Sequence, residues 1–274
     1  MKNLIDIILI QESMGDDIQK NIDKISKSIS KLIVSNTTIV VLHELSYLKY
    51  IPITKVQKNK LFAITDKSKI IKHFCNLSKD KNIYILFPFY ELHRHKFYNT
   101  TVLISPNGRI VAKYRKRNIP NEPCYEENYY FSSSKNQFPI TTINGFNIGL
   151  MTCWDQWYSD SYNKLSKKNA DLILCPTSIG SAYNGKKNIS MPGEKKKWRN
   201  VIVANSLMIN TPIVIINRIG NESRNNKRIN FWGASFITNA NGEISYQADN
   251  KKTIHKHTIN LMSKQKYQKL WGFK

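Results

Sequence analysis

Cys153 is the residue in this chain whose surroundings most strongly suggest chemistry. It follows the apolar run 146–151 in the stretch "IGLMTCWDQWYSD". That run predicts a buried strand that ends just before the thiol. A cysteine fixed at such a point can act as a nucleophile if a base takes its proton and a cation or backbone donor holds the oxyanion. The alternative is a small buried thiol that only packs.

Two other segments place carboxylates where they could serve such a nucleophile. Glu44 follows the apolar strand predicted in "TIVVLHELSY", and a carboxylate at a buried strand end is suited to general-base catalysis. Glu122, Glu126 and Glu127 lie among tyrosines in "PNEPCYEENYYF". A satisfied structural carboxylate is the alternative in both segments.

A basic segment could supply the cation. Lys113, Arg115, Lys116 and Arg117 crowd the end of a predicted strand in "GRIVAKYRKRNIP". One of these groups could point inward at a developing negative charge, and the alternative is a solvated basic run.

Taken together, these segments resemble the nitrilase superfamily of carbon–nitrogen hydrolases. The family's glutamate, lysine and cysteine motifs are matched by "LHELSY", "YRKRNIP" and "CWDQWYSD". Further similar phrases are "FYELHRHKFYNT", "CPTSIGS", "VIINRIG" and "FWGASFI", so the resemblance covers nearly the whole chain. Within the superfamily the motifs are most similar to those of the amidohydrolases that act on N-carbamoylputrescine.

The resemblance implies a role for each matched residue. Cys153 is expected to be the nucleophile that attacks a carbamoyl carbon, and Glu44 the base that later protonates the leaving nitrogen. Lys116 is expected to stabilise the oxyanion together with the backbone N–H of Trp154. Glu127 is expected to orient the substrate and Lys116. We further expect Lys116 to favour the thiolate form of Cys153.

The substrate-binding residues expected from the same motifs are Trp154, Asp155, Thr177 and Ser178. The implied reaction passes through a covalent carbamoyl-enzyme and releases an amine, carbon dioxide and ammonia. It requires neither a metal ion nor an organic cofactor.

The chain departs from the family pattern at the position that bears on the substrate. Related enzymes usually carry a glutamate where this chain has Ala182, and an acid there would suit the distal ammonium of N-carbamoylputrescine. Glu91, Asp155 or Glu194 could take its place.

Other departures are Asn118, Cys124, Ser159 and Asp160, which stand where relatives commonly have histidine, glycine, proline and glutamate. We expect Ser159 to cap the helix that follows.

Other substrates and another class of function stay open. The alternatives within the enzyme class are another N-carbamoyl amine, an N-carbamoyl amino acid or an ω-amide. A substrate with a carboxylate would need an arginine, for which Arg94 and Arg218 are candidates. The formal net charge of +23 could instead indicate a non-catalytic polyanion-binding protein. The lysines are scattered through the chain without a nucleic-acid motif, however, which favours a mutational bias and makes nucleic acid an unlikely partner.

The elements that must position these residues follow from the apolar periodicity. Buried strands are predicted at 4–10, 38–42, 82–88, 146–151, 171–175 and 212–217, and helices at 16–34, 66–79 and 195–209. Asn107-Gly108 and Asn241-Gly242 predict two β-hairpins. This order indicates an α/β protein, with residues 1–274 as one domain. The resemblance specifies a four-layer α-β-β-α sandwich that forms a homodimer or a larger assembly.

The composition limits the cellular setting. No apolar run approaches the length of a membrane helix, and the N-terminal segment is interrupted by Asp6 without a cleavage site. We therefore expect a cytoplasmic protein without membrane contact. The four cysteines have wide, irregular spacing, so neither a zinc site nor disulfides are expected.

Overall fold

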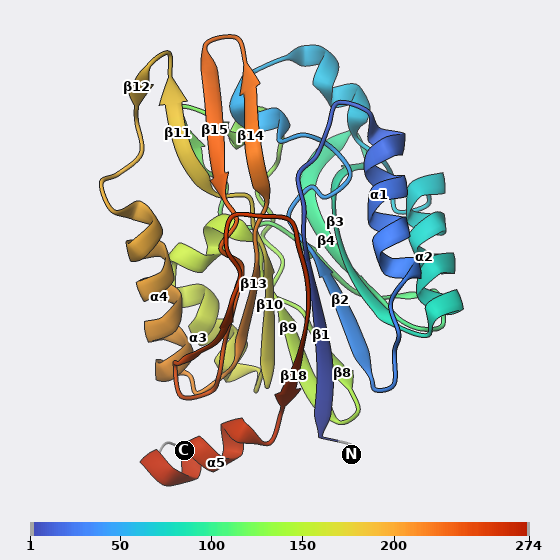
Figure 1. The fold of residues 1–274 in the computed structure, drawn as a ribbon, viewed down its shortest axis with the longest axis vertical. Helices are drawn as coiled ribbons and strands as arrows, with labels where there is room; N and C mark the ends of the chain where they lie inside the picture. The colour runs from blue at the N-terminus through green and yellow to red at the C-terminus, as the bar shows by residue number, and fades with distance from the viewer. Residues whose placement is uncertain (1–2, 273–274) are drawn as a thin grey trace.

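The computed structural model describes residues 3–272, which form two six-stranded sheets packed face to face with helices on both outer faces (Figure 1). The first sheet has the order β18-β1-β2-β3-β4-β5, with β1 (Leu4–Gln11), β2 (Thr38–Leu42), β3 (Tyr84–His93), β4 (Lys96–Ile104), β5 (Ile110–Arg115) and β18 (Thr253–Asn260). The second has the order β17-β16-β13-β10-β9-β8, with β8 (Ile140–Ile143), β9 (Phe146–Leu150), β10 (Leu172–Pro176), β13 (Ile213–Ile216), β16 (Phe236–Thr238) and β17 (Ile244–Gln247).

The helices complete the four layers. The bounds are α1 (Ile18–Ser30), α2 (Lys69–Lys81), α3 (Ser159–Lys167), α4 (Glu194–Met208) and α5 (Ser263–Trp271). Helices α1 and α2 cover the outer face of the first sheet, and α3 and α4 cover that of the second (Figure 1). The predicted α-β-β-α sandwich is therefore confirmed. Within residues 3–272, none of the helices is long and apolar enough to cross a membrane.

Strand β1 shows why its sequence suits this position. Successive side chains of a strand point to opposite faces, so a strand covered on both faces must be apolar throughout. Ile7 and Leu9 lie in the core that includes the space between the sheets, whereas Ile8 and Ile10 pack in the core beneath α1 and α2. The unbroken apolar run therefore fills two cores at once.

Parallel pairing brings the ends of the predicted strands to one edge. Strand β1 pairs in parallel with β2 and β2 with β3, while β10 pairs in parallel with β9 and with β13. Each parallel connection passes through a covering helix, as parallel strands require. The carboxyl ends of β2 and β9, which precede Glu44 and Cys153, consequently face the same region.

The predicted helices exist, with boundaries shifted by their caps. The Asp17 side chain accepts a hydrogen bond from the Lys20 N–H, so α1 begins after it. Ser68 caps α2 in the same way, and Asn82 ends that helix in the left-handed conformation. The expectation for Ser159 was wrong, because it is the first residue of α3 and makes no capping hydrogen bond.

Both predicted hairpins are present. Strands β4 and β5 pair antiparallel, as do β16 and β17, and the turns contain Gly108 and Gly242 at φ +69° and +74°. Positive φ is costly for a residue with a Cβ atom, which explains the Asn-Gly signal.

A small sheet projects from one end of the sandwich and was not predicted. It consists of β12 (Lys187–Asn188), β11 (Gly180–Asn184), β15 (Lys227–Trp232) and β14 (Ile219–Arg224), seen at the top of Figure 1. A two-stranded sheet of β6 (Asn121–Glu122) and β7 (Tyr125–Glu126) is also present. Gly180 is required in β11, because a Cβ atom there would lie 2.2 Å from the Asn230 carbonyl oxygen.

We predict that the buried Leu174 of β10 contributes more to the free energy of unfolding than an exposed leucine does. Leu174 is fully buried, whereas Leu61 is 84% exposed in the turn Gln57–Phe62. Leu174→Ala should lower the free energy of unfolding by about 2–5 kcal/mol, because it removes buried contacts and leaves a cavity. The matched change Leu61→Ala should lower it by less than about 0.5 kcal/mol. Urea unfolding followed by circular dichroism tests this, and equal effects of the two variants would contradict the assigned core.

Candidate active site

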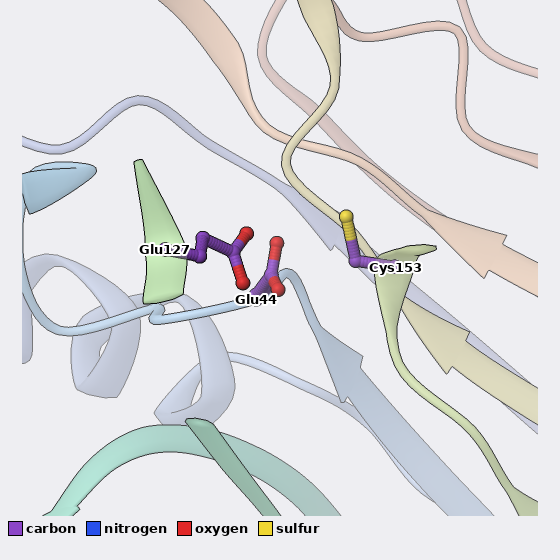
Figure 2. Close-up of side chains that lie close together, drawn as sticks. All are labelled: Glu44, Glu127 and Cys153. Atoms are coloured by element: carbon purple, nitrogen blue, oxygen red, sulfur yellow. The ribbon is translucent and has the colours of Figure 1, made fainter. Parts of the chain in front are cut away.

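The four residues predicted to be catalytic lie together in the structure. Glu44 follows β2, Lys116 follows β5, Cys153 follows β9, and Glu127 begins a 3-10 turn after β7. Cys153 is 3% exposed and the other three are fully buried. The Lys116 Nζ atom lies 2.9 Å from Glu44 Oε1 and 2.7 Å from Glu127 Oε2. Figure 2 shows the two carboxylates directed toward one another, with the Cys153 side chain on the far side of Glu44 from Glu127.

The spacing of these ligand atoms would also suit a metal ion. One atom each of Glu44, Glu127 and Cys153 lies within 4.8 Å of the other two. The Lys116 ammonium donates hydrogen bonds to both carboxylates, so a metal ion bridging them would compete with that ammonium. The Lys116 ammonium therefore already occupies the position of a cation between the two carboxylates.

Lys116 remains charged in this environment. Burial alone would favour the neutral amine, but the Glu127 and Glu44 carboxylates act in the opposite direction, and the pKa of Lys116 lies well above its ordinary value. The site therefore contains a permanent ammonium, which is the group needed to stabilise an oxyanion.

Glu44 has one oxygen engaged and one free. Its Oε1 atom accepts hydrogen bonds from Asn99 Nδ2 at 2.6 Å and from Lys116 Nζ at 2.9 Å. Its Oε2 atom is buried and has no hydrogen-bond partner among the described residues. Because a buried acceptor without a partner is unfavourable, this oxygen is suited to receive a proton.

Asn99 is a site residue that the sequence analysis missed. Besides its side-chain bond to Glu44, its carbonyl oxygen accepts a hydrogen bond from the Lys116 N–H at 2.8 Å. It thus fixes both the acid and the cation from β4. The one signal that could have identified it is the motif "FYELHRHKFYNT", in which it stands.

Glu127 lies in a strongly desolvated position. Burial raises its pKa to about 7, with Glu44 acting in the same direction and Lys116 opposing. The Tyr50 hydroxyl donates a hydrogen bond to Glu127 Oε1 at 2.5 Å. Tyr50 was also missed, because a tyrosine in a loop after the strand carries no sequence signal of this contact.

Burial sets the resting state of Cys153. Lys116 favours the thiolate, as expected, but burial and the Glu44 carboxylate outweigh it and raise the pKa of the Cys153 thiol well above its ordinary range. Cys153 rests as a thiol, so its activation requires a base. Its backbone has φ +46°, an uncommon conformation for a residue with a side chain.

Asp155 stabilises the turn Cys153–Trp157 and does not line the cavity described below. Its carboxylate accepts hydrogen bonds from the Tyr114 hydroxyl at 2.7 Å and from the Thr152 N–H at 3.1 Å. It also accepts from the backbone and side-chain nitrogens of Asn118, at 3.0 and 2.8 Å. Asp155 thus ties the turn Cys153–Trp157 to the segment that carries Lys116.

Thr177 and Ser178 likewise lie behind the nucleophile. Thr177 is fully buried, and its hydroxyl accepts a hydrogen bond from the Gln156 side chain at 3.2 Å. The Ser178 hydroxyl donates to the Glu44 carbonyl oxygen at 3.2 Å, and the Ser178 backbone lies close enough to lower the pKa of Cys153. Of the four predicted substrate-binding residues, Trp154 lines the cavity described next, and the other three do not.

A cavity of about 370 Å³ opens beside Cys153 and Trp154. Apolar side chains form much of its wall, including Ile179, Ala182, Ile189 and Met191. Its charged groups are the carboxylates of Glu122 and Glu194, and among residues 3–272 no lysine or arginine lines it. Cys153 therefore lies in a largely apolar cavity that also contains two carboxylates.

The other candidates for substrate contacts, Glu91, Arg94 and Arg218, do not line this cavity. Glu91 pairs with Lys113 and Arg115, and the pKa of its carboxyl is lowered to about 2 because their hydrogen bonds outweigh burial. Arg94 is exposed at the turn between β3 and β4. Arg218 is fully buried and bonds Glu222 and backbone carbonyl oxygens of residues 44–48.

Two other departures from the family pattern have a structural explanation. Asn118 supplies two of the hydrogen bonds to Asp155 described above. Cys124 has φ +69°, the left-handed conformation that glycine adopts most easily, and its buried thiol donates to the Tyr183 carbonyl oxygen at 3.3 Å.

Comparison with known proteins shows the family and the fold of this chain. Residues 9–269 match the family model described as carbon-nitrogen hydrolase. A citrullinase from Francisella tularensis is 28% identical, covering 98% of this chain and 93% of the relative. An N-carbamoylputrescine amidase from Arabidopsis thaliana is 28% identical, covering 88% and 81%. The crystal structure of a carbon-nitrogen hydrolase from Helicobacter pylori G27 shares the fold with a TM-score of 0.90, at 23% identity and with coverage of 98% and 94%.

We predict that Glu127 makes stability depend on pH. Its pKa of about 7 exceeds the ordinary value of 4.5. At pH values between the two, unfolding therefore releases a proton from Glu127. The wild-type protein consequently loses stability as the pH rises through this range. Glu127→Gln cannot titrate there. The stability of this variant relative to the wild type should therefore increase from about pH 5 to about pH 8. Urea midpoints measured across this range test it, and a constant difference would contradict the raised pKa.

Proposed function

The chain belongs to the carbon–nitrogen hydrolase family, and we propose that it hydrolyses the carbamoyl group of an N-carbamoyl amine, with N-carbamoylputrescine as the substrate. The products would be putrescine, carbon dioxide and ammonia. Because putrescine is a polyamine, we propose a role in polyamine biosynthesis and a cytoplasmic location. The proposal is supported by the Cys153 site, by the cavity beside it and by similarity to N-carbamoylputrescine amidases.

The first half of the proposed reaction uses the free oxygen of Glu44. Cys153 Sγ attacks the carbamoyl carbon while Glu44 Oε2 takes the thiol proton, which is needed because the thiol is protonated at rest. The Lys116 ammonium and the Trp154 N–H stabilise the oxyanion that forms. Glu44 returns the proton to the leaving nitrogen, and the carbamoyl-enzyme remains as a thiocarbamate on Cys153 Sγ.

The second half regenerates the thiol. Glu44 removes a proton from a water molecule, and the water oxygen attacks the thiocarbamate carbon and forms a second oxyanion at the same position. Collapse breaks the carbon–sulfur bond, and the sulfur recovers its proton from Glu44. The released carbamate decomposes to carbon dioxide and the second nitrogen product.

The observation that carries the choice of substrate is the composition of the cavity. Its apolar wall suits a methylene chain, and its charged lining groups are the carboxylates of Glu122 and Glu194. An alkyl amine whose carbamoyl end reaches Cys153 would place an ammonium among acidic groups. A carboxylate in that place would meet no lysine or arginine in residues 3–272 of the lining.

Citrulline is the second candidate, because of the similarity to the Francisella tularensis citrullinase. It carries the same kind of terminal carbamoyl group, but the carbon that bears its distal amine also bears a carboxylate. The guanidinium of Arg218 is held by Glu222 and backbone carbonyl oxygens, so it is not free to pair with that carboxylate.

Ammonia release from the two candidates tests the proposal. The purified protein should turn over N-carbamoylputrescine with kcat/KM at least about 10-fold higher than for citrulline, because burying an unpaired carboxylate is unfavourable. Cys153→Ala should reduce turnover at least about 1,000-fold, because the nucleophile is removed. Its melting temperature serves as the control for folding.

Two results would contradict the proposal. Turnover that survives in Cys153→Ala would show that the reaction takes place elsewhere. A clear preference for citrulline would replace the diamine by the amino acid as the substrate.

A further inference from the structure

We propose that Glu194, the first residue of α4, is the specificity-determining residue that binds the distal ammonium of the substrate. This inference rests on the proposed function and deepens it. Ala182 leaves the adjoining part of the cavity wall without a charge, and Glu194 lines the same cavity from a different element. The carboxylate is thus supplied by α4 and not by β11.

The two acidic groups of the lining differ in their exposure. Glu194 is half-buried, whereas Glu122 is exposed on β6. An ion pair at an exposed side chain is weakened by water and salt, and a partly buried pair is weakened much less. Glu194 is therefore the carboxylate that can contribute more to binding a cation.

Helix α4 holds Glu194 at a fixed position relative to the nucleophile. Trp198 lies four residues further along, on the same side of the helix, and is nearly fully buried. Its indole N–H donates to Gln156 Oε1 at 2.9 Å, and Gln156 belongs to the turn that begins at Cys153. This connection sets the separation between carboxylate and thiol.

Tyr125 supports the view that Glu194 and Cys153 share one cavity. Its hydroxyl donates to the Gly180 carbonyl oxygen at 2.9 Å and accepts from the Gly180 N–H at 3.0 Å. Tyr125 lines the cavity together with Glu194 and Cys153, as expected for a wall residue between the two ends of a bound molecule. Burial raises the pKa of Tyr125 well above its ordinary value, and the Glu194 carboxylate acts in the same direction.

The segment before α4 gives the carboxylate its surroundings. The Ala182 N–H donates to the Ser190 hydroxyl at 2.7 Å, and the Ile189 N–H donates to the Ala182 carbonyl oxygen at 2.9 Å. Burial raises the pKa of Glu194, while the Met191 backbone, the Ser190 side chain and the charge of Lys197 oppose it. Lys197 does not lie within ion-pair distance of Glu194 in the described residues, so a substrate ammonium would be its direct cationic partner.

A pair of substrates that differ in one group isolates this contact. N-carbamoylputrescine and N-pentylurea have chains of the same length, but the second ends in a methyl group in place of the ammonium. Glu194→Gln keeps the shape of the side chain and removes its charge. It should lower kcat/KM for N-carbamoylputrescine about 10- to 100-fold, mainly through KM, and change that for N-pentylurea less than about 3-fold.

Asp160→Asn is the matched control. It neutralises a carboxylate in the first turn of α3, which is exposed and pairs with Lys164 outside the cavity. It should leave the ratio of kcat/KM for the two ureas unchanged, which would exclude a general effect of net charge. N-pentylurea turnover reports whether Glu194→Gln is folded.

The outcomes separate this inference from the proposed function. If wild-type protein turns over N-carbamoylputrescine but Glu194→Gln leaves the ratio unchanged, the function stands and the role of Glu194 is overturned. The same holds if Glu122→Gln, and not Glu194→Gln, removes the preference for the amine. If wild-type protein turns over neither urea, both are overturned. Loss of the preference in Glu194→Gln alone supports the inference.

Discussion

The Lys116 ammonium lies between the carboxylates of Glu44 and Glu127, and the three side chains are fully buried. Removing one partner from such a group typically costs about 3–5 kcal/mol, because a charge is left without compensation in a medium of low dielectric constant. The rest of the site depends on this arrangement. Lys116 fixes Glu44 through Oε1 and leaves Oε2 without a partner among the described residues, so the ammonium that we propose to stabilise an oxyanion also orients the proposed base. The raised pKa of Cys153 follows from the same burial, which makes that base necessary.

The two sheets create this arrangement by bringing distant segments to one edge. Glu44 and Lys116 come from the first sheet, and Cys153 comes from the second. Asp155 joins the two sides, because it accepts hydrogen bonds from Tyr114 on β5 and from Thr152 before the nucleophile turn. Asp155 also accepts hydrogen bonds from Asn118, so one carboxylate connects the segment that carries Lys116 with the turn that begins at Cys153. Asp155 was expected to bind substrate, but both of its carboxylate oxygens accept hydrogen bonds from the chain itself.

Much of this design could be predicted from sequence, because strands covered on both faces leave an unmistakable apolar pattern. The strand at 38–42 was predicted with the bounds that the structure shows, and the positions of Glu44 and Cys153 follow from strand ends. Contacts made across the fold leave no such pattern. Tyr50 is one of 14 tyrosines, and only the folded chain brings its hydroxyl to Glu127. The small sheet was missed for a related reason, since its strands are half-exposed and lack an unbroken apolar run. The sequence showed the cation that favours the Cys153 thiolate, but it did not show the burial that outweighs this effect.

The net charge of +23 and an acidic cavity act over different distances. At physiological salt, interactions between exposed charges are screened beyond about 8 Å, so the scattered lysines act weakly on a molecule that has reached the cavity. Inside it, screening by ions is reduced and the nearest charges dominate. A cationic substrate is therefore compatible with a strongly basic chain, provided that the carboxylate it meets is partly buried. Glu194 meets this condition through its position on α4, while the overall charge can drift without changing what the cavity accepts.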